Sequence, residues 1–167
     1  DLLGGQLRTE NRDWQFPNNV VEVGRSHWDQ YLTFQRHQTN DQNPYVHDES
    51  TLRIHNDSTI AGDNLFITGF NFRDNVNDGP GANTPTEFIL INGEDSSVSS
   101  ASPIELAPGE SYDLDIRFVY SRNRSANNEQ RIAFLDILSS DPSQPTKQIT
   151  LSGGWQERAE QGNEPNV

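Results

Sequence analysis

The segment from Tyr112 to Tyr120 most restricts the fold, because apolar and polar residues alternate strictly from Tyr112 to Phe118. Its apolar positions are Tyr112, Leu114, Ile116, Phe118 and Tyr120, and they enclose Asp113, Asp115 and Arg117. A period of two places the two sets on opposite faces of an extended strand. The pattern therefore predicts a strand that is buried on one face and solvated on the other, as is typical of antiparallel sheets.

Other short runs rich in β-branched and aromatic residues are predicted to form strands, and no stretch carries the i, i+3, i+4, i+7 apolar spacing of an amphipathic helix. These runs are residues 31–35, 51–56, 64–72, 87–92, 131–138 and 148–152. Turn residues such as Asn, Asp, Gly and Pro separate them. Short strands spaced in this way predict an all-β sandwich, and a barrel is the alternative.

One predicted strand changes its pattern midway. In residues 64–72 the apolar positions pass from Leu65 and Ile67 to Phe70 and Phe72, so their parity changes at Gly69. One extra residue in a strand has this effect, and glycine is favoured at such places. We therefore predict a β-bulge at Gly69.

The two ends of the chain differ from the middle. Residues 1–27 are polar except for the run Val-Val-Glu-Val at 20–23 and are expected to form an N-terminal arm or an added edge strand. Residues 28–155 hold the predicted strands and form the expected domain. Residues 156–167 are polar throughout and are expected to be a tail or linker.

Composition excludes several classes of protein. Twelve Lys and Arg against 25 Asp and Glu give a net charge of −13, which argues against a nucleic-acid partner because phosphates are bound by clusters of basic residues. The chain has no cysteine, so disulfide frameworks and thiolate metal sites are excluded. No apolar run approaches the ~20 residues that a membrane span needs.

Catalytic motifs are missing from the sequence. It contains no Gly-x-Ser-x-Gly turn, no His-Glu-x-x-His pair and no phosphate-binding glycine loop. The histidines His27, His37, His47 and His55 stand singly, and a surface role suits them better than zinc binding or catalysis. We therefore expect a protein that is not an enzyme, with no required cofactor.

Calcium is the one metal for which the sequence offers candidate ligands. Asp74, Asn75, Asn77 and Asp78 supply hard oxygen donors in a glycine-containing stretch. The same residues form solvated turns without a metal, and this simpler interpretation is preferred. The pair Glu94 and Asp95 is a weaker candidate, and a hairpin turn explains it better.

Carbohydrate binding is suggested by aromatic residues near the ends of the predicted domain. Sugars stack their C–H faces on aromatic rings, while amide and carboxylate side chains bind their hydroxyls. The candidate sugar-binding rings are Trp14, Trp28, Trp155, Tyr45 and Tyr120. The alternative is that Trp28 and Trp155 cap the core and fix the flanking segments.

Five short motifs, taken in order, resemble ASH/Hydin-type immunoglobulin-like domains. They are Leu-Thr-Phe at 32–34, Ser-Thr-Leu-Arg-Ile-His-Asn at 50–56, Leu-Phe-Ile at 65–67, Leu-Ala-Pro-Gly-Glu-Ser at 106–111 and Ile-Thr-Leu-Ser-Gly-Gly at 149–154. Together they resemble most closely the versions found in large secreted or surface-anchored bacterial proteins. Residues 71–85 and 121–128 depart from the family pattern, and such insertions are where binding function is commonly added.

The resemblance implies a fold and a role. The fold is an all-β, immunoglobulin-like antiparallel sandwich of about seven to nine strands. The role is that of a non-catalytic spacer, display or protein-interaction module of a larger exported bacterial protein, located outside the cell or at its surface. Its partners are then neighbouring domains, a protein surface or a polysaccharide. The alternative is a carbohydrate-binding module of a glycan-degrading or adhesive protein, assisted by calcium.

Overall fold

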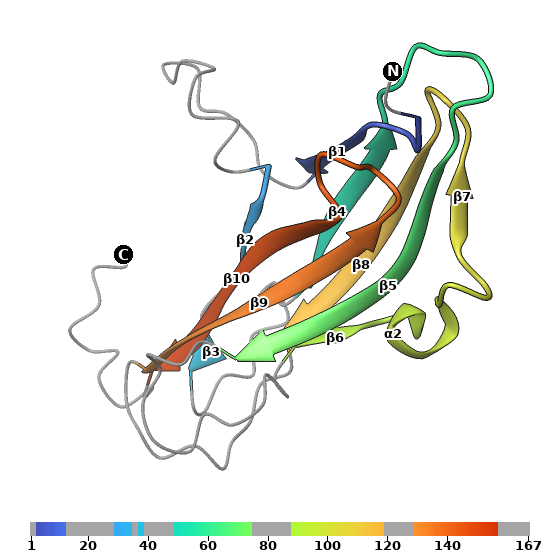
Figure 1. The fold of residues 1–167 in the computed structure, drawn as a ribbon. Coiled ribbons are helices and arrows are strands. Elements are labelled where there is room, and N and C mark those ends of the chain that lie inside the picture. Colours follow the sequence, from blue (N-terminus) through green and yellow to red (C-terminus); the bar gives the residue numbers. More distant parts are fainter. Residues whose placement is uncertain are drawn as a thin grey trace, which may run out of the picture.

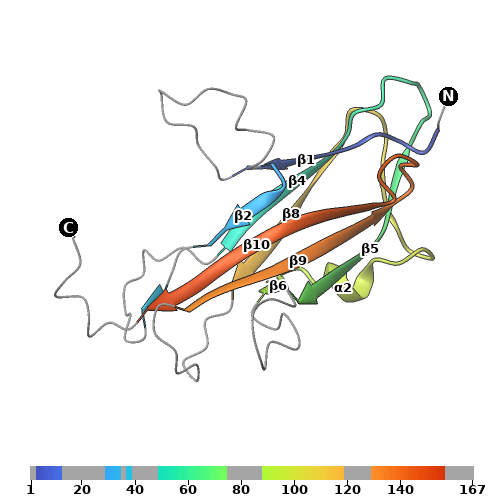
Figure 2. The same cartoon turned by 60° about the vertical axis from the view of Figure 1, so that its left-hand side comes forward.

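The structure is a computed structural model that describes residues 3–12, 29–34, 37–38, 49–74, 88–118 and 129–156. Two β-sheets pack face to face, as Figure 1 and the turned view in Figure 2 show. In the described part of the chain the helix α2 (Glu94–Ser97) has one turn, and no helix is long and apolar enough to cross a membrane.

The first sheet has four antiparallel strands in the order β1-β4-β8-β6. Their bounds are β1 Leu7–Asn11, β4 Glu49–Asn56, β8 Ser111–Phe118 and β6 Phe88–Leu90. The two inner strands have eight residues each, whereas the edge strands β1 and β6 have five and three. The sheet is therefore long in its centre and short at both edges.

The second sheet has six strands in the order β2-β10-β9-β5-β7, and β3 also pairs with β10. Their bounds are β2 Tyr31–Thr33, β3 His37–Gln38, β5 Leu65–Asp74, β7 Ile104–Leu106, β9 Glu129–Ser139 and β10 Thr146–Gln156. The strands β2 and β3 lie along the same edge of β10 and run parallel to it, while the other pairs are antiparallel. Counting these two segments as one interrupted edge strand gives nine positions, which confirms the predicted sandwich.

The core lies between the sheets and follows from the alternation of the strands. In β8, Leu114, Ile116 and Phe118 are buried, while the polar residues between them are half-buried on the outer face. Toward one end of the core the rings of Phe34, Phe88 and Phe118 form a cluster with centroid separations of 5.2 to 6.3 Å. The predicted half-buried strand is confirmed.

The predicted bulge is also confirmed. The pairing of β5 with β9 shifts register between Ile67 and Gly69, so that one residue of β5 is left over. Beyond the shift, Phe70 faces the core in place of the earlier parity. A Cβ at Gly69 would lie 3.2 Å from Leu138 of β9, so little room remains for a side chain there.

The edge strand β1 lies within residues 1–27, for which an arm or an added edge strand was expected. Its position at residues 7–11 was not predicted, because its inward residues after the first are polar. Leu7, Thr9 and Asn11 are buried, whereas Arg8 faces solvent. The Thr9 hydroxyl donates to the backbone oxygen of Asp29, and the Asn11 amide donates to that of Tyr31. Hydrogen bonds to the segment that leads into β2 thus replace the apolar contacts that a hydrophobicity pattern detects.

Asn56, at the end of β4, is fully buried and connects the segments that meet at this pole of the sandwich. Its Oδ1 accepts from the backbone nitrogens of Gln6 and Ser58, at 2.9 and 3.1 Å. Its Nδ2 donates to the backbone oxygens of Asp63 and Leu106, each at 2.9 Å. Both donors and both acceptor positions of the side chain are therefore used.

Two buried carboxylates complete this pole. Asp63 accepts from the backbone nitrogens of Gly4 and Gly5, at 2.6 and 2.9 Å, and from the Ser58 hydroxyl at 2.6 Å. Gly5 has a positive φ of 88°, and a Cβ there would lie 2.5 Å from the Cβ of Leu65. The chain can therefore pass this close to β5 only with glycine at this position.

Asp141, in the turn between β9 and β10, binds Leu7 of the same N-terminal segment. Its Oδ2 accepts from the backbone nitrogen of Leu7 at 2.8 Å, and its Oδ1 accepts from Ser143. Burial alone would raise the pKa of Asp141, but these hydrogen bonds outweigh burial and lower it. The Ser58 hydroxyl and the two glycine amides lower the pKa of Asp63.

Replacing Asn56 with alanine is expected to destabilise the fold by about 3 kcal/mol or more, because it leaves several buried backbone groups without partners. The measurement is the free energy of unfolding in urea. Asn71→Ala is the matched control, since Asn71 is exposed on β5 and should change stability by less than about 0.5 kcal/mol. Equal effects of the two substitutions would contradict the role assigned to Asn56.

Low pH is expected to reduce the free energy of unfolding, because the hydrogen bonds of Asp63 and Asp141 depend on their ionised carboxylates. A carboxyl group whose pKa is lower in the folded than in the unfolded chain stabilises the fold above its ordinary pKa of 3.8, and that stabilisation is lost as the pH falls through the lowered folded pKa. Asp63→Asn and Asp141→Asn should therefore each flatten the decline of unfolding free energy below about pH 4. The control for loss of one negative charge is Asp95→Asn, at an exposed residue of α2. A decline as steep as that of the wild type in both variants would refute the assignment.

Candidate functional site

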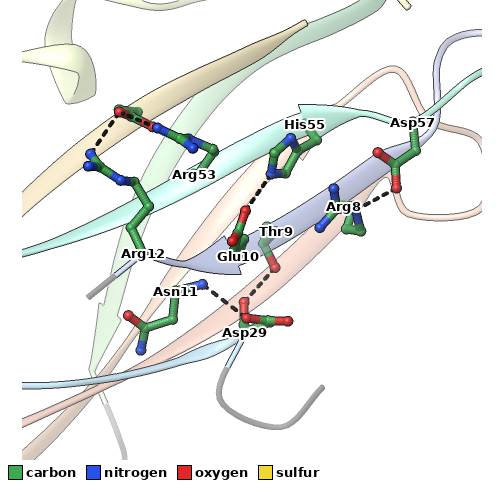
Figure 3. A network of polar contacts seen from close by, with 10 residues as sticks. Arg8, Thr9, Glu10, Asn11, Arg12, Asp29, Arg53, His55 and Asp57 are labelled. Carbon is green, nitrogen blue, oxygen red and sulfur yellow. Dashed lines mark hydrogen bonds and ion pairs between the residues drawn. The ribbon is translucent and has the colours of Figure 1, made fainter. Parts of the chain in front are cut away.

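The outer face of the four-stranded sheet carries a lattice of ion pairs across β1, β4 and β8, part of which Figure 3 shows. The Arg8 guanidinium contacts Asp57 at 2.5 Å, and His55 Nε2 lies 2.8 Å from Glu10. The Asp113 carboxylate of β8 lies between Arg12 at 3.0 Å and Arg53 at 2.8 Å.

The lattice leaves little unbalanced charge on this face. Hydrogen bonds from Arg53, with a further contribution from Arg12, hold the pKa of Asp113 below its usual value. At the other end of the sheet Arg117 pairs with Glu49. Exposed pairs of this kind stabilise a protein by less than about 1 kcal/mol each, so their main effect is to satisfy the charges locally.

A second network lies on the outer face of the six-stranded sheet. Arg73 of β5 donates to both carboxylate oxygens of Asp136, at 2.5 and 3.0 Å, and to Oε1 of Gln148 at 2.7 Å. Its guanidinium carbon also lies 5.0 Å from the ring centroid of Phe134. These contacts fix Gln148 on β10 and cover one face of the phenylalanine ring.

Next to this network, two hollows flank the contact between Gln30 and Lys147. One has a volume of about 310 Å3 and is lined by Gln30, Tyr31, Lys147, Gln148 and Thr150. The other, of about 330 Å3, lies toward β1 and includes Arg8 and Asp29. Lys147 Nζ donates to Oε1 of Gln30 at 2.8 Å, and burial lowers the pKa of Lys147.

One buried acid lies apart from these surfaces. Glu94, at the start of α2, is 3% exposed, and its Oε2 accepts from the Tyr112 hydroxyl at 2.6 Å. Its Oε1 has no hydrogen-bond partner within the described part of the chain. Burial, together with the hydrogen bond to Glu94, raises the pKa of Tyr112.

The predicted sugar-binding residues fall almost wholly outside the described ranges. Trp14, Trp28, Tyr45 and Tyr120 lie outside them. Trp155 lies in β10, where its backbone pairs with His37 of β3 and Glu129 of β9. The grouping of these rings therefore stays a prediction.

The predicted calcium ligands also lie mostly outside the described residues. Asp74 is the last residue of β5 and pairs with Ala133, while Asn75, Asn77 and Asp78 lie outside the described residues. Within the described ranges no group of three or more His, Asp or Glu side chains is placed to hold a metal ion. Glu94, of the weaker predicted pair, is instead buried against Tyr112.

Comparisons with known proteins agree with the sandwich but extend no further. The sequence matches no protein-family model and no curated protein sequence. Its structure is similar to the ASH / PapD-like domain 7 of human CEP192, with 15% identity, a TM-score of 0.48 and coverage of 92% of this chain and 87% of that one. Likeness at this identity concerns the fold alone.

Two chaperones are also similar in structure, with lower TM-scores and less of this chain covered. The periplasmic chaperone SfaE has 7% identity, a TM-score of 0.46 and coverage of 76% of this chain. The Pseudomonas aeruginosa CupB2 chaperone has 15% identity, a TM-score of 0.43 and coverage of 78%. This chain spans about half of each chaperone, 55% and 54%. Membership of the ASH/Hydin family therefore stays a prediction.

The contact between Tyr112 and Glu94 is expected to stabilise the link between α2 and β8. Tyr112→Phe leaves the buried carboxyl without its donor and should cost about 1–3 kcal/mol of unfolding free energy. In a Glu94→Leu background the same change should cost much less, because the polar partner is gone. The measurement is a double-mutant cycle by urea unfolding, and additivity within about 0.3 kcal/mol would contradict a direct interaction.

Proposed function

We propose that this domain is a non-catalytic immunoglobulin-like module of a larger exported bacterial protein, located outside the cell or at its surface. It acts as a spacer that displays or contacts neighbouring domains. The location is proposed from the resemblance of its strand motifs to secreted and surface proteins. The role as a spacer is proposed from the geometry of the described chain.

The observation that carries the proposal is the position of the two described ends. Gly4 and Gly5 are bound at the pole that holds Asp63 and Asp141. The last described strand, β10, starts near that pole and runs away from it to Gln156, beside β3 (Figure 1). Its 11 residues correspond to roughly 36 Å of extended chain. The described chain thus begins at one pole of the sandwich and ends at the opposite one, which suits a module that connects neighbouring domains end to end.

The edges of both sheets support a module that does not pair with strands of its neighbours. The edge strands β2, β6 and β7 have three residues each, and β1 has five. The inner strands have eight to 11. Short edge strands expose few backbone groups to a neighbouring chain, so contacts between domains are expected through faces and turns.

A carbohydrate-binding module is the second candidate function. It is favoured by the hollow beside Tyr31, whose size falls at the lower end of ligand pockets and whose lining residues are mostly hydrogen-bonding. This candidate and the first are compatible, because one surface of a spacer can bind a glycan while its poles connect to neighbouring domains.

The spacer function predicts an extended arrangement of tandem copies. Two copies of the 167-residue chain joined directly should have a maximum dimension in small-angle X-ray scattering close to twice that of a single copy. The control is a tandem protein with a flexible Gly/Ser segment inserted between the copies, which should be longer still and more variable. A compact pair of domains packed side by side in the direct tandem would contradict the proposal.

A further inference from the structure

Lys147 differs from the other cations whose side chains the structure describes. Arg8, Arg12, Arg53, Arg73 and Arg117 each contact an aspartate or glutamate. Lys147 has no ion pair with any described carboxylate, although the chain has 25 acidic residues. Its hydrogen-bond partner is the neutral side chain of Gln30, at 2.8 Å.

The partial burial of Lys147 makes the lack of an ion pair with a described carboxylate unusual. The side chain is half-buried, and its lowered pKa reflects the loss of water around the ammonium group. A cation removed from water is unfavourable unless an anion compensates for it. A ligand carboxylate at Lys147 would supply the charge that the described protein does not.

The two glutamines beside Lys147 are oriented by cations. Lysine and arginine can only donate hydrogen bonds, so the side-chain oxygen of each glutamine must face its cation. Gln30 turns its oxygen to Lys147, and Gln148 turns its oxygen to Arg73, at 2.8 and 2.7 Å. The Nε2 groups of both have no partner among the described residues, and both residues line the hollow.

This orientation is held by further contacts. Arg73 is itself fixed by two hydrogen bonds to Asp136. The backbone oxygen of Gln30 accepts from the backbone nitrogen of Thr150 at 3.0 Å, which ties the segment before β2 to β10. The lining of the hollow therefore presents donors from fixed positions before any ligand arrives.

We propose that the hollow lined by Gln30, Tyr31, Lys147, Gln148 and Thr150 binds one uronic acid residue of a glycan. The carboxylate of the sugar accepts from Lys147. The two glutamine amides and the Thr150 hydroxyl bind the sugar hydroxyl groups, and Tyr31 lies against the sugar ring. The volume of about 310 Å3 exceeds what a bare carboxylate needs and suits a sugar ring. This inference rests on the second candidate function, and the spacer function does not depend on it.

Charge limits which glycans suit the site. None of the five lining residues is acidic, whereas Asp29 lies in the neighbouring hollow and the whole chain carries −13. Long-range repulsion therefore opposes a polymer made only of uronic acids. The preferred ligand is a mostly neutral glycan with single uronic acid residues.

The test is a titration of the full chain with D-glucuronate, D-glucose and acetate as separate probes. Binding is measured from the NMR chemical shifts of the backbone amides of Gln30, Gln148 and Thr150. We expect glucuronate to bind with a Kd on the order of 1 mM, at least tenfold more tightly than either other probe. Equal binding of glucose would exclude the ionic contact, and equal binding of acetate would indicate a site for any carboxylate, including an acidic protein side chain. Absence of glucuronate shifts at these residues would overturn the proposal.

Variants separate the cation from general effects on the fold. Lys147→Gln keeps the length of the side chain and should reduce glucuronate affinity at least tenfold, to that of glucose. Arg117→Gln removes one positive charge from the other sheet and should leave the affinity unchanged. Unfolding in urea verifies that both variants fold. Equal affinity losses in the two variants would show a general electrostatic effect and overturn the assignment to Lys147, and unchanged affinity in Lys147→Gln would overturn it as well.

Discussion

The side-chain amide of Asn56 is the interaction on which the arrangement of one whole pole depends. It hydrogen-bonds to four separate backbone groups, accepting from two nitrogens through Oδ1 and donating to two oxygens through Nδ2. These partners belong to the N-terminal segment, the turn after β4 and the edge strand β7. No apolar residue of the same volume can take this place, since an unsatisfied buried backbone group costs about as much as a lost hydrogen bond.

The same pole determines where the edge strand β1 lies, and thereby shapes the outer surfaces. Once Gly4, Gly5 and Leu7 are bound by Asp63 and Asp141, β1 continues along β4 with a fixed register. That register places its charged side chains opposite those of β4, so the ion-pair lattice follows from the backbone anchor. It also brings β1 to the side of the sandwich where β2 meets β10, and the hollows around Lys147 lie along that side.

Sequence patterns predicted the parts of the fold that hydrophobic periodicity controls. The alternation in β8 and the parity change at Gly69 have one geometric meaning each, and both were confirmed. The position of β1 within residues 1–27 was missed because Thr9 and Asn11 are polar and face inward. Asn56 ends the predicted strand 51–56, and no local pattern indicates that its side chain is buried. The burial of Glu94 depends on Tyr112, 18 positions away. Lys147 could be counted in the sequence, but its lack of a carboxylate partner depends on contacts across sheet neighbours that no local pattern contains.

The distribution of charge links the proposed roles. An acidic chain gains solubility from its net charge. Its acidic residues outnumber its basic ones 25 to 12, so there are about two acidic residues for each basic one. On the four-stranded sheet the arginines are in fact all paired, and Asp113 serves two of them. A half-buried lysine beside two neutral amides therefore cannot be explained by a shortage of anions. The fold places it where none of the described carboxylates pairs with it, and this is the observation on which the proposed ligand carboxylate rests.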